Sequence, residues 1–157
     1  MTETKLEFAT PVWDVPPKRD ISVKDGDRIT LGDTSVALYL TPGHTMGTIS
    51  PVFDVREGGR THRALLWGGT AFNFGNNVPR LGNYIDATRR MTTVAKAQNI
   101  DVLISNHSAY DGSLAKLAAL RTQPQPNPFV LGTPTVERAL TTMGECAQAQ
   151  RDRFVLN

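Results

Sequence analysis

The strands predicted for this chain carry apolar side chains on both faces, and this constrains the fold more than any other feature. Residues 48–55 and 64–67 are short runs between turns, with apolar residues at neighbouring as well as alternate positions. Successive side chains of a strand point to opposite sides of its sheet. Strands of this kind therefore need cover on both sides, as they have in layered α/β proteins.

Local patterns predict a β meander followed by a helix, a strand and two more helices, an α/β arrangement (α+β in some schemes). Asn83 is predicted to cap the first helix, which ends near Asn99, and Ser113 and Thr133 begin the other two. The predicted strands are 28–31, 35–40, 48–55, 64–67 and 100–105. The apolar stripes predicted for the last two helices are Leu114, Leu117, Leu120 and Val136, Leu140, Met143, Ala147.

Length fits one packed domain, since the chain has 157 residues. Residues 1–20 contain three prolines and predict an irregular segment, so the folded unit is expected to span residues 21–157. The formal net charge is only +2 and the basic residues are scattered, so no nucleic-acid partner is expected. No apolar run is long enough to cross a bilayer, so no membrane partner is expected either.

The first residues lack the charged-then-apolar profile of a signal peptide, which predicts a cytoplasmic protein if Met1 is the true start. Cys146 is the only cysteine, so an internal disulfide is excluded. Its place on the apolar stripe of the last helix predicts a small buried side chain and not a nucleophile.

Two of the three histidines stand at strand ends. His44 follows the strand 35–40 in a turn built with Pro42 and Gly43, and His107 closes the strand 100–105. A rigid imidazole at a strand end suits a metal ligand. On residue chemistry alone the alternative stays open that each is an ordinary loop histidine bonded to backbone. His62, beside a hairpin tip, is expected to be a solvated surface residue.

The motifs around these histidines resemble those of the metallo-β-lactamase superfamily. Thr-Pro-Gly-His-Thr at 41–45 resembles the fourth histidine motif of that family, and Ser-Asn-His at 105–107 resembles its last ligand motif. Asn-Pro-Phe at 127–129 and Glu-Cys-Ala at 145–147 resemble the C-terminus of subclass B3. The resemblance implies the C-terminal half of a four-layer αββα sandwich. It also implies two zinc ions and hydrolysis of a β-lactam or related cyclic amide or ester in the complete protein, with a periplasmic or secreted parent.

The sequence departs from the family pattern near residue 69. Many members carry a metal-bridging aspartate where Gly69 stands in Gly-Gly-Thr at 68–70. Subclass B3 also lacks it and places a small hydroxyl residue nearby, a role that Thr70 could fill. The position expected for the disulfide mate of Cys146 is Ile100, so that bridge is absent. Tyr110 and Asp111, beside His107, are further candidates for lining the site, and Asp111 also suits the turn into the next helix.

The motif that supplies most of the family's metal ligands, His-x-His-x-Asp-His, does not occur in the sequence. By resemblance, His44 would complete one zinc site and His107 the other, so each site keeps one of its three protein ligands. A solitary imidazole cannot hold zinc tightly. The isolated chain is therefore expected to bind zinc weakly or not at all, and to have no complete catalytic set.

A half-sandwich would leave one apolar sheet face without cover. The expected partner is the missing N-terminal half or a second copy of the chain, in a homodimer closed by sheet-on-sheet contact. The alternative function is a non-catalytic module that self-associates or binds a partner through the same face. The chain's own three helices, on one side of the sheet, are not expected to cover all of the following residues: Val36, Leu38, Leu40, Ile49, Phe53, Leu65 and Trp67.

Overall fold

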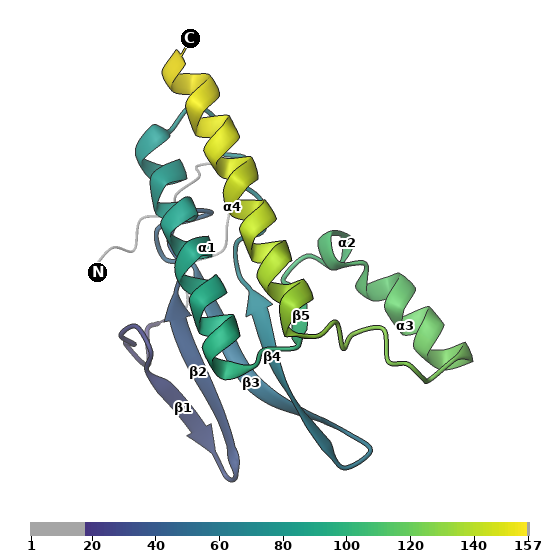
Figure 1. Cartoon of the computed structure of the whole chain (residues 1–157). Helices are drawn as coiled ribbons and strands as arrows, with labels where there is room; N and C mark the ends of the chain where they lie inside the picture. Colours follow the sequence, from purple (N-terminus) through teal and green to yellow (C-terminus); the bar gives the residue numbers. More distant parts are fainter. Residues whose placement is uncertain (1–17, 157) are drawn as a thin grey trace.

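A computed structural model describes residues 18–156 (Figure 1). Its sheet has five strands in the order β1-β2-β3-β4-β5, and the first four form an antiparallel meander. All five predicted strands are confirmed, although β4 begins four residues earlier than predicted. Most of the irregular segment predicted at 1–20 lies outside the described residues. The strands are β1 (Arg28–Leu31), β2 (Thr34–Leu40), β3 (Ile49–Glu57), β4 (Arg60–Trp67) and β5 (Val102–Ser105).

Helices α1 and α4 pack side by side against one face of the sheet, while α2 and α3 project to the side (Figure 1). The helices are α1 (Val78–Gln98), α2 (Ser108–Asp111), α3 (Ser113–Thr122) and α4 (Thr133–Leu156). Gly144 lets α1 and α4 approach closely, since an added Cβ there would lie 2.5 Å from Thr88 Oγ1. Among residues 18–156 no helix is long and apolar enough to cross a membrane.

The first helix begins earlier than predicted. Asn77, not Asn83, is its N-cap, because the Asn77 side chain accepts a hydrogen bond from the Arg80 backbone N–H at 3.1 Å. Pro79 follows in the first turn, where its missing N–H costs nothing. Asn83 lies inside the helix. The predicted end is confirmed, since Asn99 adopts the left-handed conformation with φ 53° as the C-cap.

The two faces of the sheet have different surroundings. Ala37, Val52, Leu65 and Trp67 alternate toward α1 and α4 and belong to the main core. Of the seven residues that the helices were not expected to cover together, Leu65 and Trp67 are covered, because their register places them on the helix-covered face. The opposite face, called here the distal face, carries Val36, Leu38, Leu40, Ile49, Phe53, Ala64, Leu66 and Ile104.

The distal face is apolar from one side of the sheet to the other. Leu38 is 8% exposed, while Val36, Leu40, Ile49 and Phe53 remain only half-buried. None of these four joins the main core or the side chains that pack on it. Five of the seven residues named in the sequence analysis thus lie together on the distal face, which α1 and α4 do not cover.

The apolar stripe of α3 finds no cover either. Leu114 is 72% exposed and Leu117 is 46% exposed, and no side chain of α3 is buried. The stripe of α4, in contrast, is confirmed, since Val136, Leu140 and Ala147 are fully buried. The same helical spacing of apolar residues therefore occurs in α4, which packs in the core, and in α3, which projects from it.

The β4–α1–β5 crossover places two strand ends at one edge of the sheet. Strand β5 runs parallel to β4, with Trp67 beside Ser105 at the carboxyl ends. A parallel pair requires a crossover connection, which α1 supplies. Residues 68–71 and 106–111 therefore emerge side by side at that edge, and they include most of the candidate site residues.

Candidate functional site

His44 is held in one orientation by its own backbone surroundings. It lies partly buried in the turn between β2 and β3, and its Nδ1 is 2.6 Å from the carbonyl oxygen of Ala71. A carbonyl oxygen can only accept, so Nδ1 donates this hydrogen bond, and in the neutral ring the lone pair is on Nε2. An imidazole oriented through a backbone carbonyl, with the second nitrogen unprotonated, is the arrangement that metal-ligating histidines adopt.

Arg80 clamps the same turn from the first turn of α1. Its guanidinium donates to the carbonyl of Gly43 at 2.8 Å and to the carbonyl of His44, and it lies 4.3 Å from the centre of the Phe74 ring. Sequence patterns did not single out Arg80, because a basic residue in a helix gives no signal of a partner 36 residues away. Its role is visible only in the tertiary structure.

Two glycines make room for the His44 turn. Gly43 has φ +148°, and an added Cβ would lie 2.7 Å from the Tyr84 Cα, so only glycine fits without a shift of α1. Gly69 is buried, and an added Cβ there would lie 2.7 Å from the Cβ of His44. Glycine at position 69, where many family members have aspartate, thus fits this structure, because His44 occupies the space that a side chain at 69 would need.

Thr70 connects the two histidine-bearing loops. Its Oγ1 lies 2.7 Å from Ser105 Oγ, and Ser105 Oγ also accepts from the His107 backbone N–H at 3.2 Å. The Tyr84 hydroxyl donates to the Thr70 carbonyl at 2.9 Å. Burial raises the pKa of Tyr84 to about 12, so the phenol stays a donor at neutral pH. The loop at 68–71, whose Ala71 carbonyl holds His44, is therefore joined to the His107 loop through one hydroxyl pair.

His107 is exposed and less constrained than His44. It is the N-cap residue of α2, and its ring packs edge-on against Tyr110 with the centroids 5.8 Å apart. Tyr110 is itself 58% exposed. The predicted neighbourhood of His107 and Tyr110 is thus present at the strand end, on the surface side of the edge.

Asp111 ties α2 to β5 and to the start of α3. Its carboxylate accepts from the Ser105 backbone N–H at 2.8 Å, and from the Ser113 backbone N–H at 2.9 Å and hydroxyl at 2.5 Å. Partial burial raises the pKa of Asp111, but these hydrogen bonds lower it by more, so the pKa lies below the ordinary value. Its predicted role in the turn is confirmed by these contacts.

Zinc would find one well-oriented ligand here and not a complete site. Within residues 18–156, no three His, Cys, Asp or Glu side chains gather closely enough to hold a metal ion. Zinc sites in enzymes use three protein ligands. His44 fits the part of a single ligand through its free Nε2, whereas this chain's described residues do not make up the rest of the set.

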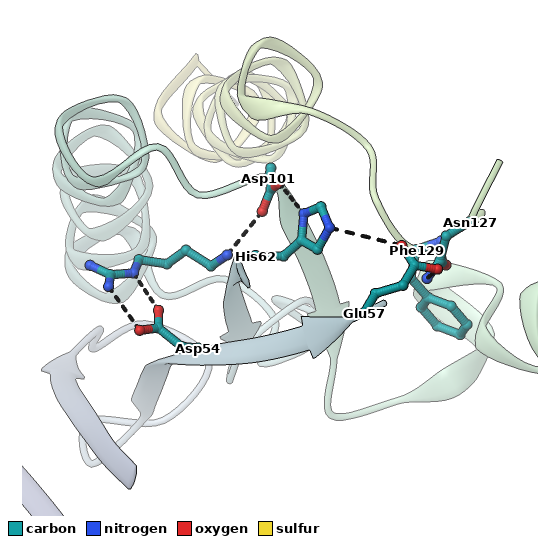
Figure 2. A network of polar contacts seen from close by, with 7 residues as sticks. Asp54, Glu57, His62, Asp101, Asn127 and Phe129 are labelled. Carbon is teal, nitrogen blue, oxygen red and sulfur yellow. Dashed lines mark hydrogen bonds and ion pairs between the residues drawn. The ribbon is translucent and has the colours of Figure 1, made fainter. Parts of the chain in front are cut away.

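His62 is not the solvated residue that its place beside the hairpin predicted. Its side chain is 13% exposed and lies between two carboxylates (Figure 2). Nδ1 donates to Asp101 Oδ2 at 2.5 Å, and Nε2 is 3.9 Å from Glu57 Oε2. Glu57 in turn accepts from the Asn127 amide at 2.8 Å. The reason is topological, since the parallel β5 and the loop before α4 cover this end of the hairpin.

Replacing His62 with alanine is expected to lower the free energy of unfolding by about 1–3 kcal/mol, because Asp101 Oδ2 loses its donor in a largely buried place. Urea unfolding followed by circular dichroism measures the change. His107→Ala is the matched control, since His107 is exposed and its substitution should alter stability by no more than about 0.5 kcal/mol. Equal stability of the two variants would contradict a structural role for His62.

Cys146 is exposed, which corrects the prediction of a buried side chain. The buried side of α4 follows Val136, Leu140, Gly144 and Ala147, and Cys146 lies beside that line. Ile100, at the position expected for a disulfide mate, is fully buried in the core.

No protein-family model matches the sequence. One curated relative is the hydroxyacylglutathione hydrolase of Maricaulis maris, which is 36% identical over 80 residues; the match covers 46% of this chain and 31% of that protein. The superfamily that the residue motifs suggested includes enzymes of this type.

Solved structures match over more of the chain. The subclass B3 metallo-β-lactamase BJP-1 of Bradyrhizobium japonicum superposes with a TM-score of 0.67 and 30% identity, covering 89% of this chain and 52% of that one. A Y228A variant of FEZ-1 from Legionella gormanii gives a TM-score of 0.70 at 21% identity, covering 85% and 51%. The di-zinc B3 enzyme LRA-12 from an Alaskan soil metagenome gives 0.60 at 21% identity, covering 88% and 52%.

This chain therefore spans about half the length of the solved enzymes that it matches. The resemblance of the sequence rested on short motifs, chief among them those around His44 and His107, and the structure places both histidines in loops at strand ends. The fold of this chain therefore corresponds to about half of the metallo-β-lactamase fold, and subclass B3 metallo-β-lactamases are among the solved structures that it resembles.

Proposed function

We propose that this chain is the C-terminal half of a zinc-dependent hydrolase and supplies His44 and His107, one to each of two zinc sites. The orientation of His44 carries the proposal. Its Nδ1–H is engaged by the Ala71 carbonyl, its Nε2 keeps a lone pair, and Arg80 fixes the turn that bears it.

The remaining ligands would come from an N-terminal half with the His-x-His-x-Asp-His motif. Zinc held in such a site supplies Lewis-acid chemistry for hydrolysis. The substrate class would be a β-lactam or a related cyclic amide or ester, in line with the B3 enzymes of similar fold. The contribution of this chain would be to orient one imidazole per site and to join the two loops through Thr70 and Ser105. Alone, the chain would be inactive.

The apolar distal face supports the proposal that a second β-sheet covers it. Val36, Leu40, Ile49 and Phe53 remain half-buried there, and the matched enzymes contain about twice the length of chain. A second copy of this chain could cover the face in the same way. The distal face therefore also supports the alternative function, a self-associating module without catalysis, and metal binding separates the two.

The isolated chain is expected to bind zinc weakly, with His44 as the main ligand. Zinc titration followed by NMR of the imidazole nitrogens should shift the His44 signals first, because its Nε2 is free and its ring is fixed. His62 should be unaffected, since both of its nitrogens face carboxylates in a largely buried place. His44→Ala should remove most of the response. A response centred on His62, or tight binding of two zinc ions by the isolated chain, would contradict the proposed ligand set.

Adding the complementary half is expected to raise the zinc affinity by orders of magnitude, because two three-ligand sites would then form. Co-expression with the N-terminal half of BJP-1, followed by equilibrium dialysis and a β-lactam hydrolysis assay, tests this. His44→Ala and His107→Ala in the complex should abolish turnover. A complex that forms with normal stability but gains no zinc would favour the non-catalytic module.

A further inference from the structure

A cleft of about 450 Å³ opens between the ends of β4 and β5, the α2–α3 segment and α4. Its walls are largely apolar and include Trp67, Leu103, Leu131, Ala139 and Met143. Trp67 is only 2% exposed and Leu103 packs on the main core, so the floor of the cleft is firmly held. Clefts of this size, apolar with a few polar groups, are the usual form of small-molecule sites.

The polar groups at the rim are already paired within the protein. Thr70 Oγ1 bonds to Ser105 Oγ, and Asp111 accepts from Ser105 and Ser113. Lys116 lies on the rim with its ammonium 5.4 Å from the centre of the Phe129 ring, and its positive charge helps to lower the pKa of Asp111. A neutral apolar occupant would leave the hydrogen bonds of Thr70 and Asp111 intact and would bring no charge against the apolar walls.

We propose that this cleft binds a neutral apolar group, such as an alkyl or aryl acyl group. Burial of that group against Trp67, Leu103 and Met143 supplies the affinity. Given the proposed function, the group belongs to the substrate of the same site. Thr70 is next to Ala71, which orients His44, and Ser105 holds the His107 backbone N–H, so the rim of the cleft is continuous with both histidine loops.

The position of the cleft separates it from the expected partner surface. Trp67 and Leu103 belong to the helix-covered side of the sheet, and of the residues that line the cleft only Ile104 was assigned to the distal face. A partner that packs on the distal face would thus leave the cleft open. Binding in the cleft also needs no metal, so its test is independent of the zinc experiments, and failure of one does not imply failure of the other.

Fluorescence of Trp67 provides a direct readout. The chain has two tryptophans, so Trp13→Phe leaves Trp67 as the only reporter. Titration of the full chain with 1-octanol, without added zinc, is expected to change the Trp67 emission in a saturable way. 2-Phenylethanol should compete for the same site.

Ala139→Phe fills the cleft from α4 and should weaken octanol binding roughly tenfold or more. Ala149→Phe makes the same change at an exposed position of the same helix, outside the cleft, and should leave the titration unchanged. Thr142→Phe, at an exposed position of the cleft wall, is a second blocking variant should Ala139→Phe fold poorly. Absence of a saturable change in the parent, or an equal response in a folded blocking variant, would overturn the proposal.

Discussion

Replacing Gly69 with aspartate is expected to unfold much of the isolated chain, although many superfamily members carry an aspartate at the matching position. The added Cβ would lie 2.7 Å from the Cβ of His44, and the position is buried. Overpacking of this kind costs about 1–3 kcal/mol, and an unpaired buried carboxylate costs several more. We expect a loss of about 4 kcal/mol or more, a large share of the stability of an ordinary domain.

Urea unfolding of the purified variant measures this loss, and Gly47→Asp is the matched control. Gly47 lies in the same turn, and an added Cβ there meets nothing within 4 Å. The control should remain close to the parent in stability. If Gly69→Asp were as stable as Gly47→Asp, His44 would have moved aside, and its fixed orientation, on which the proposed function rests, would be wrong.

The isolated chain is expected to self-associate through the distal face, with a homodimer as the simplest closed form. Each half-buried apolar side chain that gains full cover contributes up to roughly 1.5–3 kcal/mol. Val36 and Phe53 are direct cross-strand neighbours on this face. Replacing both with lysine would bury two unpaired charges in the contact, so the variant should sediment as a monomer at concentrations where the parent is dimeric.

Leu114→Lys with Leu117→Lys is the control for a general effect of charge. These side chains are exposed on α3 and are not part of the sheet, and their replacement should leave the association constant unchanged. Analytical ultracentrifugation of the three proteins separates the outcomes. A parent that stays monomeric at micromolar concentration would show that the distal face needs no partner, and the half-fold hypothesis would lose its main support.

The zinc-site hypothesis could be reached from sequence because its signals are local. Pro42, Gly43 and His44 follow directly after a strand, and His107 closes another, so the two settings are visible in short windows. The structure adds the physical connection between them, which runs from His44 to the Ala71 carbonyl and, through the neighbouring Thr70, to Ser105 beside His107. The assignment of His44 and His107 as metal ligands stays a prediction for the zinc titration to test.

Local patterning by itself determined the strands, the end of α1 at Asn99 and the core stripe of α4, because apolar period and capping chemistry act within a few residues. Tertiary structure alone decided the surroundings of His62, the clamp of Arg80 and the facing of Leu65 and Trp67. Each of these depends on an element distant in the chain: Asp101 reaches His62 only because β5 pairs with β4, and Arg80 reaches Gly43 only because α1 crosses the strand ends. Such contacts join residues that are far apart in the chain, so a pattern within a few neighbouring residues could not predict them.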